Sequence, residues 1–91
     1  MKSEYKYIFS IVKDIINKLD PIGLLSQGVP QDEYDEEISK IISGLRTCDN
    51  VEKTQKLIYN IFKENFGQET AGSINLYLEA ARSIFENLNK K

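Results

Sequence analysis

The residues best suited to chemistry form one short acidic run in the first half of the chain. Five of the fourteen acidic residues stand within six positions, in the order Asp32, Glu33, Tyr34, Asp35, Glu36, Glu37. The rest of the chain contains nine acidic residues and twelve lysines and arginines, so its net charge is +3. The total charge of -2 therefore conceals a local negative patch with a tyrosine in its middle.

Three kinds of site could use this run. A calcium loop of the EF-hand type is excluded, since the run has neither the glycine nor the spaced bidentate glutamate of such a loop. A pair of catalytic carboxylates is disfavoured, because adjacent exposed acids lack the desolvation that would separate their pKa values. Clustered acids can, however, steer a basic partner toward the protein, and a tyrosine can anchor it. The run therefore predicts a partner-binding surface made of Asp32, Glu33, Tyr34, Asp35 and Glu36. The alternative left open is that these acids only favour the start of a helix.

The rest of the composition excludes most catalytic arrangements. The chain has no histidine and a single cysteine, Cys48. It can build no Ser-His-Asp triad, no Cys-His dyad, no histidine-ligated metal and no cysteine cage for zinc. Cys48 is interpreted as a half-buried structural residue. An isoelectric point of about 5.1 and the lack of a basic stripe disfavour nucleic acid as a partner. We expect neither an enzyme nor a cofactor.

Helices must position these residues, because apolar side chains recur at steps of three and four along the chain. The pattern predicts a single all-α domain over residues 1–91, with helices at about 4–19, 35–45, 50–66 and 70–89. Asp49, with Glu52 three residues later, is predicted to cap the third helix, and Gly67 to end it. The expected architecture is a four-helix bundle or an irregular four-helix array.

The segment between the first two helices, residues 20–34, is too apolar for a solvated loop. Four aliphatic residues stand in it: Ile22, Leu24, Leu25 and Val29. Asp20 and Pro21 are predicted to cap and begin a brief helical turn through Leu25, and Gly28 to end it in a left-handed conformation. We expect an ordered apolar link that folds over the end of the helices, because its aliphatic side chains gain free energy by leaving water.

Four large side chains do not share the apolar stripe of their own helices: Tyr7, Ile11, Tyr59 and Leu76. They could be buried on a second face of a helix within the array. They could instead form an exposed apolar patch for self-association or for a partner. Both interpretations stay open, and the second gives an alternative function, a small structural or regulatory homodimer.

The sequence shows no targeting or membrane segment. Lys6, Ser10 and Lys13 interrupt the apolar positions near the N-terminus, so a secretory signal peptide is not expected. No stretch reaches the ~18–20 apolar residues of a membrane span. A chain with a single cysteine cannot form an internal disulfide, so an oxidising compartment would not stabilise its fold. We expect a cytoplasmic protein without a membrane partner.

Several short motifs are spread along the chain: Leu19-Asp20-Pro21-Ile22-Gly23-Leu24, Gly28-Val29-Pro30-Gln31-Asp32-Glu33-Tyr34, Glu37, Phe66-Gly67 and Ala71-Gly72. In these motifs, in length and in helix order, nearly the whole chain resembles the YugE-like proteins, a family of small bacterial proteins of unknown function. The family often has a tryptophan before the Asp-Pro pair, where this chain has Leu19. The resemblance implies an irregular array of four helices and supplies no activity.

These observations favour a non-catalytic protein-interaction module in a bacterial cytoplasm, either monomeric or homodimeric. In its most concrete form it is an immunity-type or antitoxin-like protein that uses the acidic run to mask a basic partner, such as a toxin domain. The regulatory homodimer is the alternative.

Overall fold

The computed structural model describes residues 2–23, 27–28 and 33–88, with side chains from residue 5 onward. Within these residues the chain is all-α, as predicted, and contains no strand. The α-helices there are α1 (Lys2–Leu19), α2 (Asp35–Gly44), α3 (Val51–Phe66), α4 (Gln68–Ala71) and α5 (Leu78–Leu88). Two short 3-10 helices accompany them, η2 (Leu45–Thr47) after α2 and η3 (Ile74–Tyr77) before α5.

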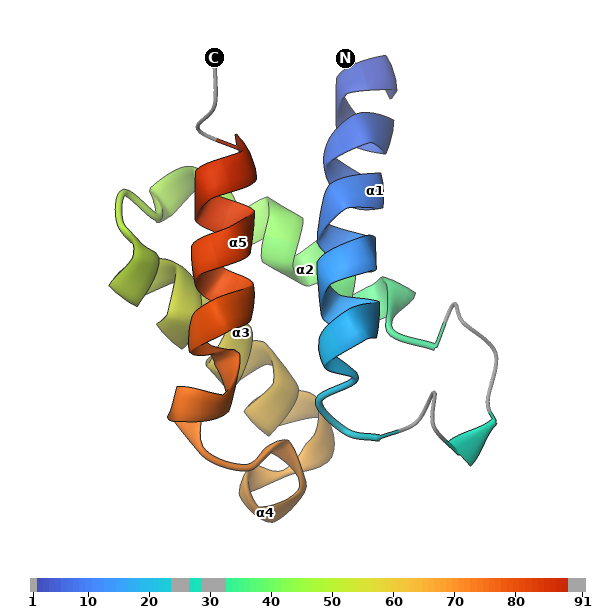
Figure 1. Ribbon diagram of the computed structural model, residues 1–91, viewed down its shortest axis with the longest axis vertical. Helices are drawn as coiled ribbons and strands as arrows, with labels where there is room; N and C mark the ends of the chain where they lie inside the picture. Colours follow the sequence, from blue (N-terminus) through green and yellow to red (C-terminus); the bar gives the residue numbers. More distant parts are fainter. Residues whose placement is uncertain (1, 24–26, 29–32, 89–91) are drawn as a thin grey trace.

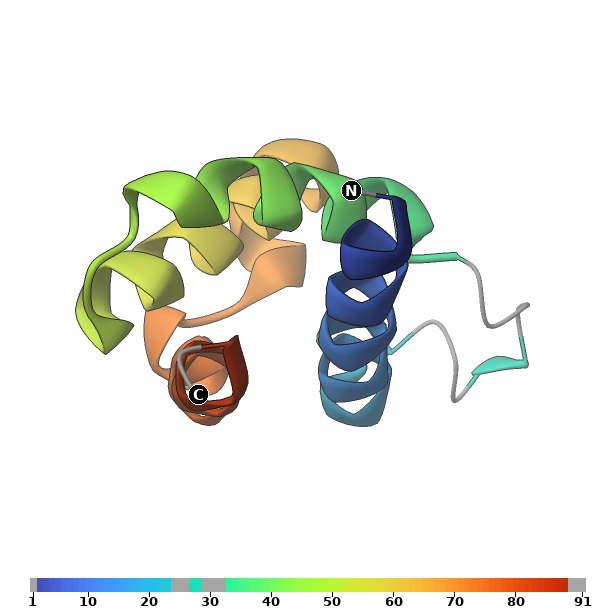
Figure 2. The ribbon, with the colours of Figure 1, turned by 90° about the horizontal axis from the view of Figure 1, so that it is seen from above.

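The helices form two layers that cross each other. α1 and α5 run antiparallel on one side of the molecule, and α2 crosses behind them (Figures 1 and 2). α3 packs against both α2 and α5, and α1 packs against α2 and α5. The core therefore lies between the pair α1–α5 and the helices behind it.

The prediction of one helix over 70–89 is wrong, since this stretch contains the end of α4, then η3 and α5 as separate elements. Gly67 and Gly72 have positive φ angles of 90° and 82°. Glycine adopts this backbone conformation without strain, and it ends α3 at Gly67 and α4 at Gly72. Gly67 thus has its predicted role. The Ser73 hydroxyl accepts a 3.2 Å hydrogen bond from the Asn75 amide at the start of η3. Apolar spacing continues through this break, so the periodic pattern alone does not show it.

Asn50 caps the third helix in place of the predicted Asp49. Asn50 has an extended backbone, and its Oδ1 accepts a 2.8 Å hydrogen bond from the Lys53 amide. This bond satisfies one of the free amides in the first turn. Asp49 instead lies 3.2 Å from the Lys53 ammonium. Both residue types cap helices well, so only the backbone geometry separates them.

The core is built around Phe62 of α3. Its ring centroid lies 5.7 Å from that of Tyr34 and 5.8 Å from that of Tyr77, and all three side chains are fully buried. Aliphatic residues from four helices close around these rings: Val12, Ile16, Ile38, Ile41, Ile58 and Ile84. Aromatic pairs at such separations stabilise a fold by ~0.5–1.5 kcal/mol each, in addition to the free energy gained when their surface is buried.

Tyr77 makes the fold sensitive to high pH. Its hydroxyl donates a 2.6 Å hydrogen bond to the Ala71 carbonyl oxygen. Burial, with a smaller contribution from Tyr59, raises the pKa of Tyr77 from 10.0 to about 12. The unfolded chain therefore releases this proton near the lower value, while the folded chain holds it up to the higher one. We expect the stabilisation from this group to be complete below about pH 10 and to be lost as the pH rises to about 12, which denaturant titrations at fixed pH measure.

Tyr77→Phe is the matched control for this pH dependence. Phenylalanine has no phenol proton, so the variant should lose less stability than the wild type over the same pH interval. Any decline that remains in the variant has an origin other than this phenol. Parallel profiles for the two proteins would contradict an origin in the buried phenol.

Candidate functional site

Tyr34, the predicted aromatic anchor of the acidic run, is a core residue. Its side chain is fully buried, and its ring packs edge-on against Phe62. Its hydroxyl donates a 2.6 Å hydrogen bond to Asp20 Oδ1 and accepts one of 3.2 Å from the Ile22 amide. A ring in this position cannot hold a partner without leaving the core, so the partner-binding role predicted for Tyr34 is corrected to a structural one.

The same hydrogen bonds fix the first part of the link after α1. Asp20 has a positive φ of 48°, and its amide donates to the Ile16 carbonyl oxygen at 2.8 Å. It therefore ends α1, with a backbone conformation that differs from that of the predicted helix cap. A turn does begin here, because the Asp20 carbonyl oxygen accepts a 2.9 Å hydrogen bond from the Gly23 amide. Ile22 is half-buried against the core, as expected, and Gly28 has the predicted positive φ, at 91°. Leu24, Leu25 and Val29 lie outside the described residues.

The acidic run is divided between the core and the surface. Asp35 lies 3.1 Å from the Lys13 ammonium, and Glu37 is buried and accepts a 2.7 Å hydrogen bond from the Asn65 side-chain amide. Glu33 and Glu36 are exposed, and Glu36 lies 3.9 Å from the Lys40 ammonium. Asp32 lies outside the described residues. The exposed acids of the described run are thus Glu33 and Glu36, and their role in binding stays a prediction.

The four side chains outside the apolar stripes divide into two pairs. Tyr7 and Leu76 are exposed, with 66% and 45% of their surface accessible. Ile11 and Tyr59 are half-buried, and the Tyr59 ring centroid lies 5.9 Å from that of Tyr77. Tyr59 therefore belongs to the edge of the core, while Tyr7 and Leu76 lie at the surface.

A groove of about 580 Å³ lies between α1 and α5. Its lining residues come from both helices: Ile11, Asp14, Ile15, Lys18 and Leu19 on α1, and Glu79, Ala80, Ser83 and Asn87 on α5. Asp14, Lys18 and Glu79 stand at its edges, since their side chains are 70–83% exposed. Ala80 is buried and Ile15 is half-buried, so the bottom of the groove is apolar.

The edges of the groove satisfy their own polar groups. On α1, Lys18 lies 3.6 Å from Asp14. On α5, Arg82 lies 2.9 Å from Glu79, and the Asn87 side-chain amide donates a 2.7 Å hydrogen bond to a backbone carbonyl oxygen one turn earlier. The apolar bottom is therefore the part of the groove that gains most from being covered.

Sequence reasoning found only one wall of this groove. Ile11 stands out because it leaves the apolar stripe of its helix, whereas Ile15 and Leu19 pack against the core. On α5, small or short residues recur at steps of three and four, at Ala80, Ser83 and Asn87. That recurrence is the signal that could have indicated a second, open face of the last helix.

Other kinds of site find little support in the part of the chain described. No group of histidine, cysteine, aspartate and glutamate side chains there could hold a metal ion. Cys48 is half-buried, as interpreted, and its Sγ lies 3.6 Å from the Gly44 carbonyl oxygen. Among the same described residues, every helix is too short or too polar to span a bilayer.

Comparison of the chain with protein-family models, with curated proteins and with solved structures finds no match.

Proposed function

We propose that this chain is a non-catalytic protein-interaction module of the bacterial cytoplasm, which binds a helix in the groove between α1 and α5. The observation that carries the proposal is the apolar bottom of the groove between edges whose charges are already paired. An amphipathic helix that lays its apolar face into such a groove is a common mode of recognition. The absence of histidine from the sequence and its single cysteine agree with a role in binding.

The lengths of α1 and α5 limit the length of a helix that could bind between them. α1 has 18 residues and α5 has 11, which correspond to lengths of roughly 27 and 16 Å at 1.5 Å per residue. The shorter helix limits the contact to about three turns of a bound helix. Such a helix would present apolar residues at steps of three and four toward Ile11 and Ile15, with polar residues toward Lys18 and Glu79.

The acidic surface supplies a second candidate, an immunity-type protein that masks a basic partner. It is favoured by the exposure of Glu33 and Glu36 near the start of α2, where Lys40, at 3.9 Å from Glu36, compensates only one of the two carboxylates. Exposed charges of this kind act mainly on the rate of association with a basic protein. This candidate needs no apolar groove, so the two can be tested apart.

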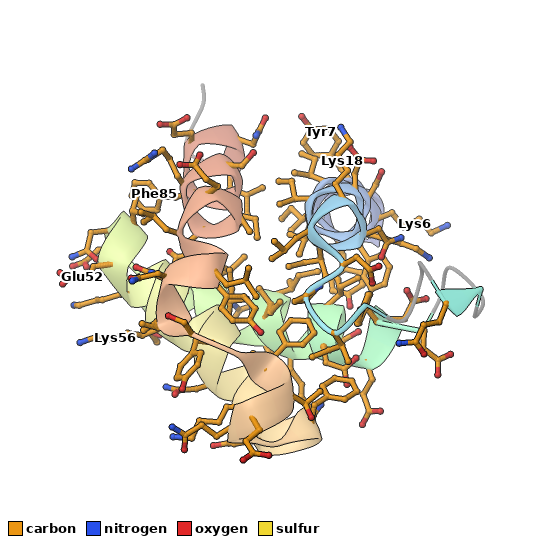
Figure 3. All side chains as sticks on the ribbon, turned by 60° about the horizontal axis from the view of Figure 1, so that its bottom comes forward. Lys6, Tyr7, Lys18, Glu52, Lys56 and Phe85 are labelled. Atoms are coloured by element: carbon orange, nitrogen blue, oxygen red, sulfur yellow. The ribbon has the colours of Figure 1, made fainter. Side chains whose placement is uncertain are left out.

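A photoreactive amino acid placed at single positions in the chain, in the bacterial cells that produce it, tests both candidates. Position 11 reports on the groove, position 33 on the acidic surface, and position 56 is the control. Lys56 is exposed on α3 and points away from α1 (Figure 3). We expect a covalent adduct from position 11 and none from position 56.

The adducts distinguish the outcomes. An adduct with a basic protein from position 33 alone would favour the acidic surface over the groove. Equal adduct formation at positions 11 and 56 would indicate random collision and would overturn the groove proposal.

A further inference from the structure

We draw no further inference here: the strongest candidate, the surface patch of Tyr7 and Ile11 on α1 beside the groove, carries nothing beyond the proposed function, because nothing in the described part of the chain shows which partner covers it.

Discussion

Replacement of Phe62 with alanine is expected to lower the free energy of unfolding by about 3–5 kcal/mol. The Phe62 side chain is fully buried, and its ring stacks against Phe66 and Tyr77 and meets Tyr34 edge-on. Its removal leaves a cavity at the point where α3 meets α2 and the end of the link. Denaturant titration at several protein concentrations measures the loss and separates it from any contribution of self-association.

Lys56→Ala on the same helix is the control for this prediction, because Lys56 is exposed. It should change the free energy of unfolding by no more than about 0.5 kcal/mol. Phe62→Leu, which keeps part of the apolar volume, should fall between the two. A loss below about 1 kcal/mol for Phe62→Ala would show that the core is not centred on this ring.

Tyr34→Ala should cost about 3–5 kcal/mol by the same mechanism, but Tyr34→Phe separates the ring from the hydroxyl. The hydroxyl donates to Asp20 at 2.6 Å and accepts from the Ile22 amide at 3.2 Å. Because hydrogen bonds to charged groups contribute about 1.5–3 kcal/mol, the phenylalanine variant should lose an amount in that range. Hydrogen exchange localises the effect, and the Ile22 amide should exchange faster in Tyr34→Phe.

The amide of Lys53 provides the internal control in that experiment. It donates a hydrogen bond to the Asn50 side chain, and both residues are distant in sequence from the link. Faster exchange at both amides would indicate general destabilisation. Unchanged exchange at Ile22 would mean that the Tyr34 hydroxyl does not hold the link.

Periodicity predicts most of the fold because the first three helices bury one stripe each. The predicted spans 4–19, 35–45 and 50–66 agree with α1, α2 and α3 to within two residues at each end. The pattern fails after Gly67 because 3-10 and α-helical turns differ too little in period to be separated over four residues. The two glycines, Gly67 and Gly72, and the serine after them mark the break more clearly than the apolar residues do.

The candidate site was harder to predict because its contacts join distant parts of the chain. Tyr34 stands among acids in the sequence, and its burial depends on Asp20 and on Phe62, which lies 28 positions later. Glu37 has the same apparent environment, yet it bonds to Asn65 on another helix. Ile11 was recognised as unusual, but nothing next to it in sequence indicates that α5 forms the opposite wall of a groove.

The hydrogen bond between Tyr34 and Asp20 closes a ring of chain from residue 20 to residue 34. The first end follows α1 directly, the second is buried in the core, and the Ile22 amide adds a hydrogen bond to the Tyr34 hydroxyl. The entropy cost of closing a flexible loop rises only with the logarithm of its length, by about 0.6 kcal/mol for each doubling. By this relation, a change in the number of residues between Asp20 and Tyr34 alters the closure entropy only slightly, so the hydrogen bond between them constrains the identity of its two partners more than the length of chain that separates them.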